Sequence, residues 1–172
     1  MSNGPIPKKV DPRKFADRGV RIAGEVSLSD MPNFQQAIVG DEGHVQVDLQ
    51  FSLDERRIRT IQGSAEGYVF MTCQRCLEPV KVTVEAEFNL GVAYNEEKAV
   101  QLPRYYDPLI VENDEVELLP VIEEELILSM PHDAYHDDCE VKTFYGDAEA
   151  LEKDTEKPNP FSVLAQLKAS NK

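Results

Sequence analysis

The chain has 172 residues, of which 41% are hydrophobic and 29% charged, and its formal net charge is −14. This composition is typical of one globular domain with polar tails, and it excludes a fibrous or wholly disordered chain. No apolar run approaches the ~18–20 residues of a membrane span, and the first residues lack the apolar core of a signal peptide. We therefore expect a cytoplasmic protein.

The first elements are predicted from residues that start or end helices and from the alternation of apolar and polar residues. Asp11 followed by Pro12 predicts the start of a short helix, and Gly19 predicts its end. Alternating apolar and polar residues predict a strand over residues 20–26. Ser29 and Asp30 could open a second helix that closes before the glycines at 40–43.

The middle of the chain has the clearest pattern. Strict alternation predicts strands over residues 45–53, 58–71 and 80–90, joined by short polar turns. Gly63 and Gly67 are candidates for bulges or bends in the second of these strands. The three strands predict an antiparallel meander.

The second half predicts a loop over residues 95–107, a short strand at 109–111 and a helix over 117–130. We read the three glutamates at 123–125 as a solvated helix face. The fold class is therefore α+β. We expect an antiparallel meander of four to five strands, either open or barrel-like, packed by one long helix, with short N- and C-terminal helices.

The domain organisation follows from composition. Residues 1–130 are expected to form a single globular domain, followed by an acidic flexible linker over 131–158. A short amphipathic helix is predicted over 159–168. Its apolar residues, which dock either on a partner or on the chain's own domain, are Phe161, Leu164 and Leu167.

The chain has three cysteines, an odd number that argues against a disulfide framework. Cys73 and Cys76 form a C-x-x-C pair between two predicted strands, and Cys139 follows two histidines. With His132 or His136, and His132 preferred, they could complete a Cys₃His site for structural zinc. Reduced thiols without metal fit equally well. Redox catalysis fits less well, because that motif normally opens a helix.

Charge is strongly segregated along the chain. Residues 1–81 carry 11 acidic and 11 basic side chains, whereas residues 107–156 carry 17 acidic and 2 basic ones. The acidic stretch repels phosphate and attracts basic proteins. RNA contact would instead use the basic N-terminal arm and the hairpin tip near residue 57. The candidate RNA-binding residues are Lys8, Lys9, Lys14, Arg18, Arg56 and Arg57.

Four segments stand in a recognisable order: CQRC at 73–76, YDPLIV at 106–111, EEELILSMP at 123–131 and EKPNPFSVLAQLK at 156–168. Their order and spacing resemble the YceD family of large ribosomal RNA subunit accumulation proteins, in its proteobacterial form. The resemblance implies a bacterial cytosolic protein that supports synthesis, processing or stability of 23S rRNA. It carries over no catalytic residue. Some members have further cysteine pairs after the long helix, where this chain has Cys139 and two histidines.

We therefore expect a non-catalytic ribosome biogenesis factor that binds a component of the large-subunit precursor. In the first hypothesis the acidic stretch binds a basic ribosomal protein. In the alternative, the basic arm binds precursor 23S rRNA directly. A C-x-x-C thiol oxidoreductase ranks third, since no motif assembles a nucleophile, a base and an orienting group. Neither a membrane nor a small-molecule substrate is expected.

Overall fold

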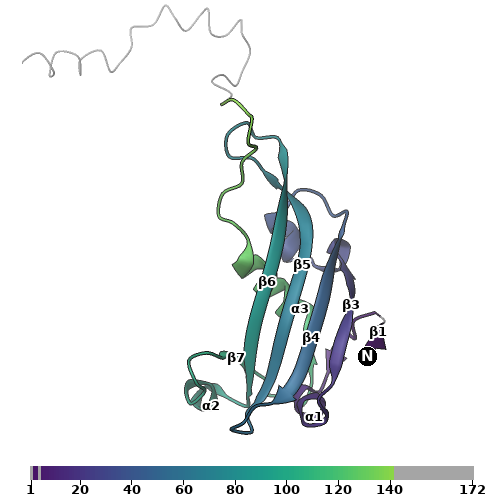
Figure 1. Cartoon of the computed structure of the whole chain (residues 1–172), viewed down its shortest axis with the longest axis vertical. Helices are drawn as coiled ribbons and strands as arrows, with labels where there is room; N and C mark the ends of the chain where they lie inside the picture. Colours follow the sequence, from purple (N-terminus) through teal and green to yellow (C-terminus); the bar gives the residue numbers. More distant parts are fainter. Residues whose placement is uncertain (1, 4, 142–172) are drawn as a thin grey trace, which may run out of the picture. The chain divides into compact units, whose positions relative to one another are not determined.

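Three consecutive strands form the centre of the fold (Figure 1). In the computed structural model, which describes residues 2–3 and 5–141, they are β4 (His44–Leu53), β5 (Arg59–Thr72) and β6 (Pro79–Ala93). Each pairs antiparallel with the next, so the predicted meander is confirmed. The alternation fixes the faces, because successive side chains of a strand point to opposite sides of a sheet. In β4 every second residue from Val45 to Phe51 is buried.

Three further strands extend this sheet. β3 (Arg21–Ser27) pairs antiparallel with β4, whereas β1 (Ser2–Asn3) and β7 (Asp107–Ile110) add parallel at the two edges. Over the described residues the order β1-β3-β4-β5-β6-β7 is linear, so the sheet is open and does not close into a barrel. A separate short ladder joins β2 (Lys9–Val10) to β8 (Val116–Glu117).

The main helix, α3 (Leu118–Ser129), packs against one face of this sheet (Figure 1). It buries Leu118, Ile122 and Leu126 in the same core as the apolar residues of β4, β5 and β6. Its 12 residues span roughly 18 Å, whereas the 14 residues of β5 span roughly 46 Å. The expected helix is therefore present, but it is short beside the sheet, because Pro131 follows the last turn. Among the described residues, no helix is long and apolar enough to cross a membrane.

The N-terminal helix prediction is confirmed by α1 (Pro12–Arg18). The Asp11 side chain accepts hydrogen bonds from the backbone N–H groups of Arg13 and Lys14 at 3.1 and 3.0 Å. Gly19 ends the helix with a left-handed φ of 64°, which a residue without Cβ adopts easily. The cap and the stop signal therefore both act as the sequence predicts.

Two connections differ from expectation. The helix predicted to start near Ser29 is instead a pair of 3₁₀ turns, η1 (Leu28–Asp30) and η2 (Phe34–Ala37). Pro32 lies between them, lacks an N–H group and disfavours helical backbone in the residue before it. The predicted loop at 95–107 contains a short helix, α2 (Glu96–Val100), whose first turn is capped by the Asn95 side chain.

Neither Gly63 nor Gly67 makes a bulge, because the pairing register runs unbroken through both. Gly63 lies opposite Phe88, and a Cβ atom there would lie 2.1 Å from two atoms of the Phe88 ring. A Cβ atom on Gly67 would lie 2.9 Å from the carbonyl oxygen of His44. Both glycines therefore admit close neighbours, and the strand ladders continue through them.

The three glutamates of α3 do not share one environment. Glu124 is exposed, but Glu123 is only 2% exposed, which corrects the expectation of a solvated face. The Glu123 carboxylate accepts hydrogen bonds from the backbone N–H groups of Asn33 and Phe34 at 2.9 and 3.3 Å. It also accepts one from the Asn33 side-chain amide at 3.1 Å. Glu123 thus fastens η2 to α3.

We predict that Glu123→Ala lowers the free energy of unfolding by about 2–4 kcal/mol, because it removes three hydrogen bonds to a buried carboxylate. Glu124→Ala, next to it and exposed, should change the free energy by less than about 0.5 kcal/mol. Urea denaturation followed by circular dichroism measures both. Equal stability of the two variants would show that the buried carboxylate does not hold η2.

Candidate metal centre

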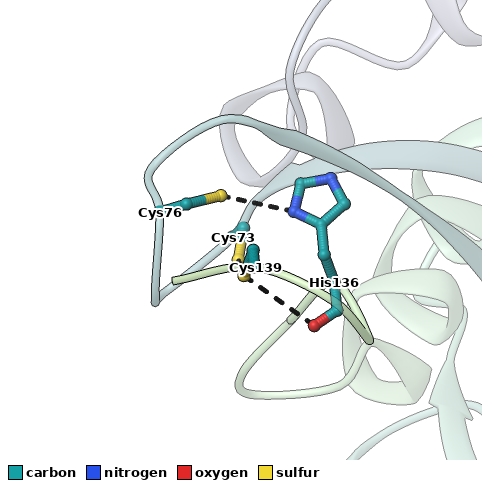
Figure 2. A group of neighbouring side chains, drawn as sticks. All are labelled: Cys73, Cys76, His136 and Cys139. Atoms are coloured by element: carbon teal, nitrogen blue, oxygen red, sulfur yellow. Dashed lines mark hydrogen bonds between the residues drawn. The ribbon is translucent and has the colours of Figure 1, made fainter. Parts of the chain in front are cut away.

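The turn between β5 and β6 presents two cysteine thiols (Figure 2). The backbone N–H of Cys73 donates to Glu78 O, and the N–H of Leu77 donates to Cys73 O, both at 2.9 Å. Leu77 takes a left-handed φ of 63°, which curls the chain after Cys76. The turn therefore brings Cys73 and Cys76 onto one small site, and both are buried.

The segment after α3 supplies the other half of the site. Ala134 bridges Cys73 in parallel, and the N–H of Gln74 donates to Ala134 O at 2.9 Å. A turn then carries His136 and Cys139 to the two thiols. Residues up to Cys139 consequently belong to one compact unit, which extends beyond the expected domain end at Met130.

Four potential ligand atoms converge from these two segments: the sulfurs of Cys73, Cys76 and Cys139 and a ring nitrogen of His136, all within 4.8 Å of one another (Figure 2). The Sγ atoms of Cys73 and Cys139 are 3.6 Å apart, and Cys76 Sγ lies 3.3 Å from His136 Nδ1. Around a tetrahedral zinc ion, S···S and S···N edges measure about 3.8 and 3.6 Å, given its usual bond lengths. These two separations are close to the tetrahedral values, so the four side chains form a group that could hold a metal ion such as zinc.

The orientation of the His136 ring supports the same assignment. Its Nε2 lies 3.1 Å from the carbonyl oxygen of Pro79. A carbonyl only accepts hydrogen bonds, so Nε2 carries the proton and donates it. In the neutral ring this leaves the lone pair of Nδ1 directed at the site, which is the arrangement that metal-binding histidines normally use.

The local electrostatics favour a thiolate at Cys73. Burial raises the pKa of Cys73, but hydrogen bonds from the backbone N–H groups of Cys76, His136 and Arg75 outweigh it and lower the pKa to about 5. The pKa of Cys139 is raised, first by burial and then by the thiols of Cys73 and Cys76. Several thiolates in one small site repel one another, and a divalent cation supplies the opposite charge that stabilises them together.

Arg75 contacts the segment that carries His136 and Cys139. Its guanidinium donates to Cys139 O at 3.1 Å and lies 5.7 Å from the centre of the Tyr135 ring. Its backbone N–H also points at Cys73 Sγ, at 3.4 Å. Arg75, one of the two residues between the cysteines, therefore connects the hairpin to the segment that carries His136.

His132, the preferred histidine of the sequence analysis, is exposed and does not belong to this cluster. It precedes the bridge at Ala134, whereas His136 follows it and lies in the turn that also carries Cys139. One sequence signal could have favoured His136. It lies three residues before Cys139, the same spacing as that between Cys73 and Cys76.

The redox alternative lacks the usual structural context of its motif. A redox C-x-x-C motif opens a helix, whose N-terminus stabilises the thiolate. Here the pair lies in a hairpin turn and is followed by β6.

The candidate RNA-binding cations have different surroundings. Lys9 pairs with Glu117 at 3.2 Å and Lys14 pairs with Asp11 at 2.9 Å, so their charges are largely compensated. The other four, which are exposed, are Lys8, Arg18, Arg56 and Arg57. The predicted partner-binding residues Phe161, Leu164 and Leu167 lie outside the described residues, as do the helix at 159–168 and most of the expected linker.

Comparison with known proteins decides the family. The profile of a family described as "Large ribosomal RNA subunit accumulation protein YceD" matches residues 61–168. A protein of that name from Haemophilus influenzae, a proteobacterium, is 35% identical over 177 residues, covering 98% of this chain and 99% of its own. The chain belongs to the YceD family. The resemblance drawn from the sequence is thereby confirmed, and no solved structure matches the chain.

The YceD match bears directly on the metal centre. All four candidate ligands lie within the matched range of residues 61–168. The name of the family refers to accumulation of the large ribosomal RNA and places the protein in bacterial ribosome biogenesis. The family name mentions no metal, and the candidate centre rests on the geometry of its four side chains.

Proposed function

We propose that this YceD protein is a non-catalytic factor that supports accumulation of 23S rRNA by binding a basic protein of the large-subunit precursor. The observation that carries the proposal is the segregation of charge. Residues 107–141 contain twelve acidic and no basic residues. Ribosomal assembly combines RNA with basic proteins, and an acidic surface attracts the proteins while it repels the phosphates.

Part of this charge gathers where Asp107, the first residue of β7, lies near Glu124 and Glu125 of α3. We call Asp107, Glu124 and Glu125 the α3–β7 acidic surface. The pKa of Glu125 is raised, first by burial and then by the negative charges of Asp107 and Glu124. These carboxylates therefore destabilise one another when ionised. A cationic partner would relieve that repulsion, which favours binding of a basic protein at this surface.

The same distribution disfavours the basic arm as the main RNA contact, because Lys9 and Lys14 already have acidic partners. The predicted helix at 159–168 remains a proposed apolar anchor for the protein partner, through Phe161, Leu164 and Leu167.

We further propose that the centre formed by Cys73, Cys76, His136 and Cys139 holds one structural Zn²⁺. All four positions are filled by protein ligands, which is typical of structural zinc and leaves no open position for a reacting water. The ion would join the segment after α3 to the β5–β6 hairpin. It would thereby stabilise residues 131–139, which contribute few apolar residues of their own to the core.

We predict that the purified protein carries about one zinc per chain, measured by mass spectrometry of the metal, and that chelation lowers the melting temperature. His136→Ala should weaken zinc binding by at least about a hundredfold, because it removes a ligand. His132→Ala is the matched control, since this exposed histidine lies outside the cluster. Equal zinc content in both variants would exclude the Cys₃His centre.

We predict that the triple variant Asp107→Asn/Glu124→Gln/Glu125→Gln loses capture of basic ribosomal proteins, because it removes the surface that attracts them. The immobilised full chain is mixed with protein extracted from large ribosomal subunits and freed of RNA, and the bound proteins are identified. The matched control is Glu66→Gln/Glu85→Gln/Glu87→Gln, which removes the same charge from exposed positions of β5 and β6.

The control variant should capture what the natural chain captures. Equal loss in both variants would mean that net charge alone is responsible and would contradict a defined surface. A parallel purification from growing cells, with and without RNase, tests the role itself. Disappearance of every ribosomal protein after RNase treatment would favour direct binding to 23S rRNA instead.

A further inference from the structure

A cleft lies at the first residues of β5, at the opposite end of this strand from the candidate metal centre. β5 begins at Arg59 and ends at Thr72, next to Cys73, so its two ends are roughly 46 Å apart. Lined by side chains of α1, α2 and the β4–β5 turn, this cleft has a volume of about 260 Å³. Four cationic side chains line this cleft, and none of the residues that line it is acidic.

Each cation comes from a different element. Arg13 lies on α1, Arg59 begins β5 and Lys98 lies on α2. Arg57 lies in the β4–β5 turn with a left-handed φ of 64°, and its N–H donates to Asp54 O at 2.9 Å. The cationic lining is therefore a product of the tertiary fold and does not come from one basic run in the sequence.

Two of these charges are compensated and two are not. Arg13 pairs with Asp114 at 3.3 Å, and Arg59 pairs with Asp17 at 2.9 Å. Within the described part of the chain, Arg57 forms no ion pair, and the Lys98 ammonium donates to the neutral Gln101 amide at 3.1 Å. Two uncompensated cations in a cleft that has four cationic and no acidic lining residues would attract an anionic ligand.

The cleft also contains an aromatic side chain. Tyr94 lines it and is 50% exposed, and the guanidinium of Arg13 lies 4.3 Å from the centre of its ring. The buried part of Arg13 thus holds the ring in place while much of it stays accessible. Proteins that bind single-stranded nucleic acid combine these two features, cations for phosphates and aromatic rings on which bases stack.

We propose that this cleft binds one phosphate-bearing nucleotide, either within a single-stranded RNA or free. Arg57 and Lys98 contact the phosphate, and Tyr94 contacts the base. The volume of about 260 Å³ lies just below the ~300–1,000 Å³ of small-molecule sites, so it suits one nucleotide and excludes a duplex. This site does not depend on the α3–β7 acidic surface, and either can fail without the other.

Binding of a labelled 12-nucleotide single-stranded RNA to the full chain, followed by fluorescence anisotropy, tests the proposal. Arg57→Gln/Lys98→Gln should weaken binding at least about tenfold. It should also reduce the slope of log K against log salt by about 1.4, the value for two phosphate contacts on a single strand. Tyr94→Leu should weaken binding about fivefold or more, because it removes stacking, and should leave the salt slope unchanged.

The matched control is Lys81→Gln/Arg104→Gln, which removes two exposed positive charges that do not line the cleft. It should change the affinity by less than about twofold. Adenosine monophosphate as competitor distinguishes the two ligand sources. Binding of the monophosphate but not of RNA, with loss in Arg57→Gln/Lys98→Gln, assigns the cleft to free nucleotides. Binding of neither, or equal weakening in both double variants, overturns the proposal.

Discussion

The pairing of β5 with β6 is the constraint on which the rest of the molecule depends. Its register is continuous from Thr60 opposite Gly91 to Thr72 opposite Pro79. A slip of one residue would move every apolar side chain of a strand to the other face of the sheet, so the buried face holds this register firmly. The contact of Phe88 with Gly63 fixes it further, because a side chain at residue 63 would collide with the ring. The turn at Cys73 and the cationic cleft lie at opposite ends of this pair of strands, and both are positioned by it.

The long strands and the helices α1 and α3 could be predicted because their signals are local. Alternation over β4 or a cap at Asp11 needs no knowledge of the remaining chain. What could not be predicted comes from contacts between distant residues. The edge strands β1 and β7 pair parallel with their neighbours, so each needs a connection that returns the chain to the same end of the sheet. The burial of Glu123 depends on Asn33, which is far from it in sequence.

The candidate metal centre likewise combines ligands that could be predicted from local sequence with one that depends on a contact between distant residues. The two cysteines of the hairpin could be chosen from sequence, because a C-x-x-C pair in a short turn is a local chelating unit. The choice between His132 and His136 could not be made with confidence from composition, since both are near Cys139. It is decided by the bridge between Ala134 and Cys73, a contact between residues far apart in the chain. The equal spacing of His136–Cys139 and Cys73–Cys76 is the one local signal that agrees with it.

The acidic second half must be held to the domain against its own repulsion. In each of its ion pairs to the N-terminal elements, Glu117 with Lys9 and Asp114 with Arg13, the acidic side chain is exposed, and exposed pairs contribute only about 0–1 kcal/mol each. The three apolar residues that α3 buries contribute more, roughly 1.5–3 kcal/mol each. In the described residues beyond α3, apolar burial is sparse, and the proposed metal would hold this segment through the ligands that converge at Cys73. With α3 held by apolar contacts and the segment after it by the proposed metal, the exposed carboxylates of the described part of this half can serve the proposed binding of a basic protein.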